Sequence, residues 1–287
     1  MTRRNNDERQ GAMATGDGSP AAASMPAMSA PSELSFVVPT EFVELPSRGR
    51  YYDEAHPLHN QETIEVRHMT AKDEDILSSR ALLKNGLAID RLLSSIIVDK
   101  RVNPNSLLVG DKNAVIVAAR ISAYTSEYAT KVTCPHCAAT ADHVFDLSKV
   151  TLNYGDDYGD LNISQDQDGS FVITLPVTKA QVTTKFLTGV DEKRMLKAAA
   201  ARRKANQIDN LVTMNMKLFT HSINGVTKRQ ELDNFINNMP TLDSQYLRTA
   251  YSRIVPNVDM VQEYVCEECS SESTLEVPFT ADFFWPR

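Results

Sequence analysis

The sequence predicts an α+β fold in which mostly helical lobes are joined by a discontinuous β element that resembles two halves of a zinc ribbon. All four cysteines occur in two C-x-x-C pairs, and a strand-like segment follows each pair in matching register. Apolar residues recur at helical spacing before the first pair and again between the two pairs. The predicted fold also includes a β-hairpin insertion and a disordered N-terminal tail.

Composition and charge narrow the class of protein. The chain has 287 residues, 42% of them hydrophobic, and a formal net charge of −7. This charge argues against a protein whose whole surface coats nucleic acid or an anionic membrane. No apolar run approaches the roughly 18 residues of a membrane span, and no apolar stretch follows Arg3 and Arg4 as a secretory signal requires. We therefore expect a reducing cytoplasm, where cysteines seldom form disulfides.

The N-terminal part of the chain is predicted to contain little regular structure. Residues 1–34 lack apolar periodicity, which predicts a disordered tail, with a spacer or a segment that orders on a partner as further roles. Residues 35–67 combine short β-like runs with prolines and Gly49, which predicts an extended arm with turns. Its segment LPSRGRYY ends in Tyr51 and Tyr52. These two rings either pack onto the domain or belong to a docking arm that binds a partner.

Residues 68–130 are predicted to form a helical block. Thr70 and Asp73 have the spacing of a capping box, and apolar residues follow at helical spacing. Gly86 ends or breaks this helix, a second helix continues the pattern, and Asp111 can begin a third. The apolar faces are sufficient for a small helical core.

A β-hairpin is predicted over residues 155–187, where the alternating segments DLNIS and FVITLPV flank a polar turn. Aspartates are frequent around this turn, and they raise the question of a calcium site. Their spacing fits no EF-hand loop, so we interpret them as solvated turn residues.

Residues 188–258 are predicted to form a helical insertion. Thr188 and Asp191 repeat the capping-box spacing, and an apolar helical face follows them. The segment 191–217 carries seven basic and three acidic residues. Because no aromatic residues are interleaved with the basic ones, a solvated face or an acidic partner is preferred over a nucleic-acid phosphate.

The two pairs Cys134/Cys137 and Cys266/Cys269 are predicted to hold one zinc ion. Two residues between cysteines allow both sulfur atoms to face one centre, and two such turns supply the four thiolates that zinc accepts in tetrahedral geometry. Residues 131–154 form the first predicted half of the ribbon. Residues 259–287 form the second half and an aromatic C-terminus. A closed site of four thiolates has no open position for water, so its predicted role is structural.

Two other interpretations of the cysteines remain. The tetrapeptide CPHC occurs in thioredoxin-like oxidants, but their first cysteine begins a helix, whereas the segment after Cys137 alternates without a helical face. Metal-free packing of the thiols is the second interpretation. His136 and His143 are expected to be bystanders because four thiols are available. The 128 residues between Cys137 and Cys266 add only about 2 kcal/mol to the cost of closing the loop, which a structural zinc site offsets.

The remaining motifs favour a protein that functions by binding other proteins and not by catalysis. The segment ADFFWPR places Phe283, Phe284 and Trp285 near the chain end, where the rings either cap the core or present a binding surface to a partner. The sequence contains no phosphate-binding glycine loop, nucleophile elbow, HExxH helix or dinucleotide fingerprint. We therefore expect no enzyme activity and no small-molecule substrate.

Several ordered segments resemble baseplate proteins of T-even-type contractile bacteriophages, in the hub-subunit family. These segments are ELPSRGRYY, IEVRHMTAKDEDILSSRALLKNG, MPTLDSQYLRTAYSRIVPNV before CEEC, and the terminal FTADFFWP. The resemblance covers most of the chain from about Phe36 onward, and the Ala/Ser-rich N-terminus departs from it.

The resemblance implies a late viral protein with a role in tail assembly. Its expected partners are other baseplate and tail proteins. It is either a structural subunit kept in the virion baseplate or a hub assembly protein that acts in the host cytoplasm. The alternative is an intracellular zinc-ribbon protein that binds nucleic acid.

Overall fold

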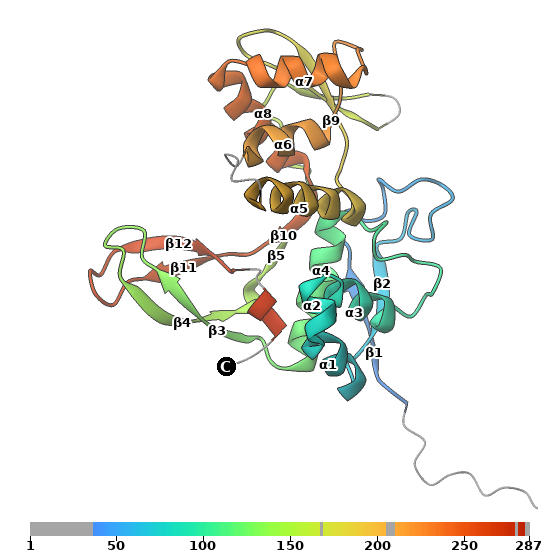
Figure 1. Ribbon diagram of the computed structural model, residues 1–287, viewed down its shortest axis with the longest axis vertical. Coiled ribbons are helices and arrows are strands. Elements are labelled where there is room, and N and C mark those ends of the chain that lie inside the picture. Colours follow the sequence, from blue (N-terminus) through green and yellow to red (C-terminus); the bar gives the residue numbers. More distant parts are fainter. Residues whose placement is uncertain (1–36, 167–168, 205–209, 279–280, 285–287) are drawn as a thin grey trace, which may run out of the picture. The chain divides into compact units, whose positions relative to one another are not determined.

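Short antiparallel sheets and eight α-helices make up the described part of the chain (Figure 1). The computed structural model describes residues 37–166, 169–204, 210–278 and 281–284. The chain from Val38 onward is one compact unit, and its buried apolar residues fall into two clusters. We call residues 38–153 and 257–284, which supply the first cluster, the first lobe, and residues 155–256, which supply the second, the second lobe. The mixed α+β class predicted from the sequence is confirmed, while the predicted tail, 1–34, lies outside the described residues.

A two-stranded sheet opens the first lobe. β1 (Thr40–Glu44) pairs antiparallel with β2 (Thr63–Arg67). Gly49, in the connection between the strands, has φ +69°, and a Cβ atom there would clash with the backbone oxygen of Leu58. Only glycine therefore fits this turn. The segment 35–67, predicted as an extended arm, is paired and packed against the core from Thr40 onward.

Four helices follow in the first lobe: α1 (Ala71–Ser78), α2 (Arg80–Lys84), α3 (Ala88–Ile96) and α4 (Val109–Ala123). The predicted capping pair before α1 is confirmed, because the backbone N–H and the hydroxyl of Thr70 both donate to Oδ2 of Asp73 at 2.8 Å. Thr188 donates to Asp191 in the same two ways, each at 3.3 Å, which confirms the second capping pair. Gly86 follows α2 with φ +65°, in agreement with the predicted break.

A buried carboxylate joins α4 to the connection between β1 and β2. Asp111 is fully buried and accepts hydrogen bonds from the backbone N–H of Ser47 at 2.9 Å, from the Ser47 hydroxyl at 2.5 Å and from the Tyr52 hydroxyl at 2.7 Å. Burial is the main cause that raises the pKa of Asp111, although these donors oppose the shift. Tyr52 is itself only 7% exposed. Its ring packs onto the domain, the first of its two predicted roles, and offers little surface to a partner.

The second lobe leaves and rejoins the first lobe at one place. β5 (Thr151–Asn153) pairs antiparallel with β10 (Asn257–Asp259), so both ends of the insertion are held by main-chain hydrogen bonds. A Cβ atom at Gly110 would clash with the carbonyl oxygen of Pro256. The absence of a side chain at Gly110 therefore lets α4 approach the end of the insertion closely. The main chain itself closes the long loop between the two cysteine pairs.

The second lobe contains a four-stranded antiparallel sheet and four helices. Its strands, in spatial order, are β6 (Ile163–Gln165), β7 (Phe171–Thr174), β8 (Gln181–Thr184) and β9 (Thr220–Ile223). Its helices are α5 (Gly189–Lys204), α6 (Leu211–Phe219), α7 (Arg229–Asn238) and α8 (Thr241–Ile254). The predicted hairpin is confirmed as β6 and β7, but the sequence did not predict β9. Of the helices in the described ranges, none has the length and apolar character needed to cross a membrane.

One core joins the predicted hairpin, 155–187, to the predicted helical insertion, 188–258. Ile173 of β7 is fully buried with Phe219 of α6 and Leu247 of α8 in the second cluster. Strands and helices of this lobe thus bury one another's apolar faces. The two predicted segments form one structural lobe.

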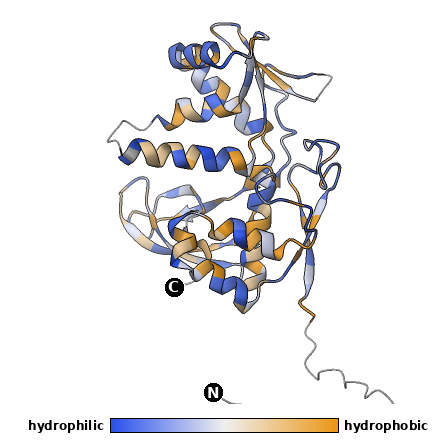
Figure 2. Ribbon diagram, turned by 45° about the vertical axis from the view of Figure 1, so that its right-hand side comes forward, coloured by the Kyte–Doolittle hydropathy of each residue, from blue (hydrophilic) through white to orange (hydrophobic). Residues whose placement is uncertain are grey.

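Two charged side chains of the basic helix α5 form ion pairs with helices of the first lobe. Lys193 pairs with Asp90 of α3 at 2.5 Å, and Glu192 accepts from Lys112 of α4 at 2.7 Å. Hydrophilic and hydrophobic residues mix along α5 (Figure 2). These ion pairs connect the helix to the first lobe. One pair neutralises a positive charge of α5 and the other a negative charge, so together they leave the net charge of the helix unchanged.

The C-terminal aromatic residues cap the first core. The 3₁₀-helix η2 (Ala281–Phe284) places Phe283 and Phe284 inside, each 1% exposed. The backbone oxygen of Phe283 accepts a hydrogen bond from the buried guanidinium of Arg120 at 2.9 Å. The two rings thus take the core-capping role, the first of their two predicted roles. In this fold neither ring presents the partner-binding surface that was the other alternative.

A second buried carboxylate orders the connection between β7 and β8. Asp243, in the first turn of α8, is fully buried and accepts hydrogen bonds from the backbone N–H groups of Val177 and Thr178 at 2.7 and 2.9 Å. The hydroxyl of Thr178 donates to the same carboxylate at 2.7 Å. Desolvation acts to raise the pKa of Asp243, but these donors outweigh it and lower the pKa. The carboxylate therefore stabilises the fold above the unfolded-state pKa, about 3.9, and this stabilisation is lost as pH falls through the lowered pKa.

We expect Asp243→Asn to lower the free energy of unfolding by about 2 kcal/mol at pH 7, the range for hydrogen bonds to a charged group. Urea unfolding measures this difference. The gap from the wild type should narrow in strong acid, because the wild-type carboxylate then becomes protonated too. Asp75→Asn, at an exposed position of α1, is the matched control and should leave stability unchanged. Equal losses in both variants would contradict the role assigned to Asp243.

We expect Phe284→Ala to lower the free energy of unfolding by about 3–5 kcal/mol, because it removes a fully buried ring. Thermal and urea unfolding provide the measurement. Phe42→Ala is the control, since that ring is 71% exposed in β1. Wild-type stability of Phe284→Ala would reinstate the alternative that the terminal rings serve a partner.

Candidate metal centre

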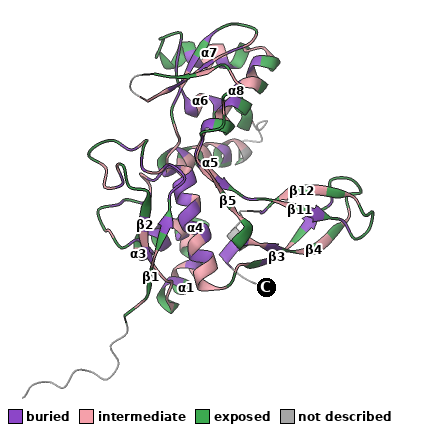
Figure 3. Ribbon diagram, turned by 180° about the vertical axis from the view of Figure 1, so that it is seen from behind, coloured by how far each residue is buried: buried purple, intermediate pink, exposed green. Residues whose placement is uncertain are grey.

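Two β-hairpins carry the four cysteines. β3 (Glu127–Thr133) pairs antiparallel with β4 (Thr140–Asp146), and β11 (Val261–Val265) pairs with β12 (Glu272–Glu276). The hairpins lie side by side in Figures 1 and 3. Each C-x-x-C pair lies in the turn between the two strands of its hairpin. The strand predicted after each cysteine pair is therefore present.

The two turns have the same backbone hydrogen bonds. In the first turn the N–H of Cys134 donates to the oxygen of Ala139 at 2.8 Å, and the N–H of Ala138 donates to the oxygen of Cys134 at 3.0 Å. Cys266 makes the two equivalent bonds in the second turn, at 3.1 and 2.9 Å. The residue after the second cysteine has a left-handed backbone in both turns, with φ 58° at Ala138 and 53° at Ser270. The chain thus builds one local structure twice.

The four sulfur atoms form one cluster. The Sγ atoms of Cys134 and Cys269 are 3.8 Å apart. Those of Cys137 and Cys266 are 3.7 Å apart, and all four lie within 4.8 Å of one another. Four sulfur atoms about 2.3 Å from a central tetrahedral zinc ion would be about 3.8 Å apart, whereas a disulfide needs about 2.05 Å. The donor set and its spacing fit a tetrahedral, thiolate-bound metal ion.

Each hairpin contributes one buried and one exposed cysteine. Cys134 and Cys266 are 1% and 2% exposed, whereas Cys137 and Cys269 reach the surface. The two short sulfur distances each join a buried cysteine of one hairpin to an exposed cysteine of the other. Because four thiols are available for four tetrahedral positions, such a centre is closed to substrate and suited to a structural role.

The backbone of the second turn favours ionised sulfur. The N–H of Cys269 lowers the pKa of Cys266 to about 6, with the N–H of Glu268 acting in the same direction against desolvation. The N–H of Ser271 acts likewise on Cys269, but the neighbouring thiol of Cys137 and desolvation raise the pKa of Cys269 to about 12. Adjacent thiolates repel one another, so the four sulfur atoms ionise together only around a cation.

The redox interpretation lacks its structural requirement. Cys134 lies in a turn between two strands and not at the N-terminus of a helix, where the reactive cysteine of a thioredoxin-like protein lies. His136 is exposed, and the ring of His143 packs edge-on against Phe145 and Tyr264, with centroid distances of 4.6 and 5.2 Å. Within the described ranges, the four cysteines are the one group of three or more His, Cys, Asp or Glu side chains close enough to share an ion.

Polar contacts that the sequence did not predict also join the hairpins. The side chain of Gln262 accepts from the backbone N–H of Asp146 at 3.1 Å and donates to the backbone oxygen of Asp146 at 2.8 Å. His143 and Tyr264 add the ring contact described above. The strands follow the two cysteine pairs at equal offsets in the sequence, and this signal could have predicted that the two hairpins pack together. No sequence pattern identifies an amide side chain that binds the main chain 116 residues away.

Tyr51 lies apart from the cysteine cluster. It is half-buried and lines a groove of about 900 Å³, together with Arg50, Lys185 and His221. Its ring packs edge-on against Phe186 at a centroid distance of 4.6 Å. Tyr52 also borders this groove but is almost fully buried, and Trp285 lies outside the described residues.

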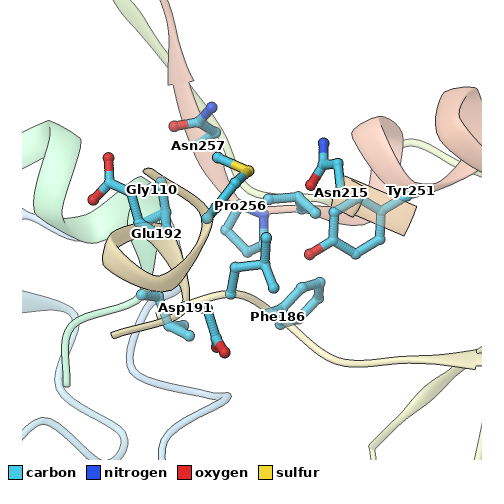
Figure 4. A pocket seen from close by; sticks show the side chains of 13 residues that line it. Gly110, Phe186, Asp191, Glu192, Asn215, Tyr251, Pro256 and Asn257 are labelled. Atoms are coloured by element: carbon cyan, nitrogen blue, oxygen red, sulfur yellow. The ribbon is translucent and has the colours of Figure 1, made fainter. Parts of the chain in front are cut away.

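A smaller pocket of about 290 Å³ lies where α4, α5 and α8 meet (Figure 4). Its two acidic side chains already have partners, because Asp191 accepts from Lys185 at 3.1 Å and Glu192 accepts from Lys112 at 2.7 Å. The Tyr251 hydroxyl donates to the backbone oxygen of Lys185 at 3.1 Å. Because these polar groups serve the fold, we assign no ligand site to this pocket.

Comparison with known protein families matches residues 39–285 to the family described as T4 bacteriophage base plate protein. Comparisons with curated proteins and with solved structures found no match. The matched range includes both lobes and both cysteine hairpins, and thus all four sulfur atoms of the candidate centre. It also contains the segments whose resemblance to phage baseplate proteins the sequence indicated, except for Pro286 at the end of the last one. The chain therefore belongs to the T4 bacteriophage baseplate protein family.

Proposed function

We propose that this protein is a structural or assembly component of the hub in a contractile phage tail baseplate, held together by zinc bound to its four cysteines. Membership of the baseplate family supports the tail role. The ordered segments that resemble hub subunits support the hub assignment. The sulfur distances of 3.7 and 3.8 Å are the observation that carries the metal assignment.

Zinc would clamp one hairpin to the other within the first lobe. Tyr128 and Phe145 of the first hairpin share a core with Tyr264 of the second. The second lobe is attached separately, by the β5–β10 pair and by the ion pairs of α5. Because its ligands all belong to the first lobe, the ion would not join that lobe to the second one. Zinc supplies no chemistry in this role beyond bonding to sulfur.

The protein would act through contacts with other baseplate and tail proteins. The groove beside Tyr51 is one candidate surface. The outer face of the second hairpin is another, where Val261 and Val265 are 51% and 58% exposed. Residues 257–278 contain six acidic and no basic residues, which disfavours nucleic acid as the partner of this hairpin. A closed four-thiolate centre likewise favours a structural role over catalysis.

Elemental analysis of protein purified under reducing conditions should find about one zinc per chain, since four thiolates complete a tetrahedral site. We expect Cys134→Ser and Cys266→Ser to lose the zinc and to lower the midpoint of thermal unfolding. His136→Ser is the matched control from the first turn, and it should keep its zinc and the wild-type midpoint of thermal unfolding. Zinc-free wild-type protein with the unfolding midpoint of the cysteine variants would refute the metal assignment.

Mass spectrometry of purified virions and of tail assembly intermediates tests the baseplate role. We expect peptides of this chain in one or both fractions, and defective tails in phage that carry Cys266→Ser. Presence in virions identifies a structural subunit, and presence in the intermediates alone identifies an assembly protein of the host cytoplasm. Normal tails from phage that lack the gene would contradict the proposal. Salt-dependent DNA binding by the purified protein would instead favour the nucleic-acid alternative.

A further inference from the structure

The two cysteine hairpins differ at one cross-strand pair that joins a buried residue to a half-buried one. In the first hairpin Val132 lies opposite Ala141, and in the second Tyr264 lies opposite Ser273. Both pairs occupy the same positions relative to the first cysteine of their turn. An apolar pair in one hairpin is thus replaced by two hydroxyl-bearing residues in the other.

The Tyr264 hydroxyl is buried without a well-formed hydrogen bond to the described residues. The side chain is 4% exposed, and its Oη atom is inaccessible to water. Leaving such a group unpaired is unfavourable, and phenylalanine would fill the same volume without that cost. The hydroxyl therefore needs an acceptor that becomes effective in another state of the protein.

The sulfur of Cys266 is the acceptor that the geometry provides. Residues two apart in a strand point to the same face, and Tyr264 and Cys266 are both buried on the inner face of the second hairpin. The ring of His143 holds the tyrosine ring edge-on. The Tyr264 hydroxyl lies close enough to Cys266 for the two side chains to interact.

We propose that the Tyr264 hydroxyl donates a hydrogen bond to the Cys266 thiolate when the four cysteines hold their metal ion. Tyr264 is then a positioning residue of the metal centre, and the inference rests on the proposed metal site. A neutral thiol is a weak acceptor, whereas a thiolate is a strong one, so ionisation of Cys266 on metal binding satisfies the buried donor. Val132 cannot make the equivalent bond to Cys134. The centre is therefore asymmetric, with one of its two buried sulfur atoms supported by a tyrosine.

Tyr264→Phe removes the hydroxyl and keeps the ring, and the cobalt(II)-substituted protein reports on the sulfur atoms. A hydrogen bond lowers the energy of the sulfur lone pairs, so its loss should move the thiolate-to-cobalt charge-transfer band to longer wavelength. Transfer of zinc to a chromogenic chelator should become about tenfold faster, as for other residues that support metal ligands. Tyr128→Phe is the matched control, because its buried hydroxyl lies 3.5 Å from the backbone oxygen of Pro278. The Tyr128→Phe variant should keep the wild-type charge-transfer band and zinc-transfer rate.

Thermal unfolding separates this role from simple packing. In metal-free protein, Tyr264→Phe should unfold no earlier than the wild type, because the variant loses only an unpaired hydroxyl. In zinc-loaded protein it should unfold at a lower temperature. An unchanged cobalt band and zinc-transfer rate in Tyr264→Phe would overturn the inference and leave the metal centre in place. Failure of the wild type to bind cobalt or zinc would instead remove the metal centre, and this inference with it.

Discussion

The close approach of four cysteine sulfur atoms is the feature on which the proposed role of the two hairpins depends. The turns bring Cys134 and Cys266 to the inside and their partners Cys137 and Cys269 to the surface, at distances that suit a tetrahedral ion. Backbone N–H groups favour ionised sulfur in the second turn. Sulfur atoms so close together cannot all carry charge unless a cation lies among them. The same electrostatics explain why a buried donor such as Tyr264 is useful beside one of the thiolates.

From the spacing of the cysteines alone, the metal ion would close the long loop between the two pairs. In the structure, main-chain hydrogen bonds close this loop. The second lobe is closed by the pairing of β5 with β10, and Gly110 permits the close approach of α4 to Pro256. Both cysteine hairpins belong to the first lobe and share its apolar core. A metal ion held by the four cysteines would thus be a local clamp between the hairpins. In a baseplate subunit, we expect such a clamp to preserve the shape of a surface on which other subunits pack.

Burial decides which aromatic residues are open to other proteins. Tyr52 and Phe284 serve the core, Tyr52 by donating to Asp111 and Phe284 by filling the cap formed by η2. Both Tyr51 and Tyr52 border an open groove, but Tyr51 is only half-buried whereas Tyr52 is 7% exposed. Lys193 of α5 binds Asp90 inside the protein and Glu192 of the same helix binds Lys112, so these ion pairs leave the net charge of α5 unchanged.

The sequence by itself determined the features that depend on residues a few positions apart. The cysteine turns, the capping pair at Thr70 and its repeat at Thr188, and the β6–β7 hairpin all follow from such spacings. Only the tertiary structure decided that β9 joins the sheet, that hairpin and helices form one lobe, and that Phe283 is buried beside Arg120. These outcomes depend on which distant side chains meet. A short strand such as β9 acquires its hydrogen bonds and apolar contacts from segments remote in the chain, so its own residues carry little signal.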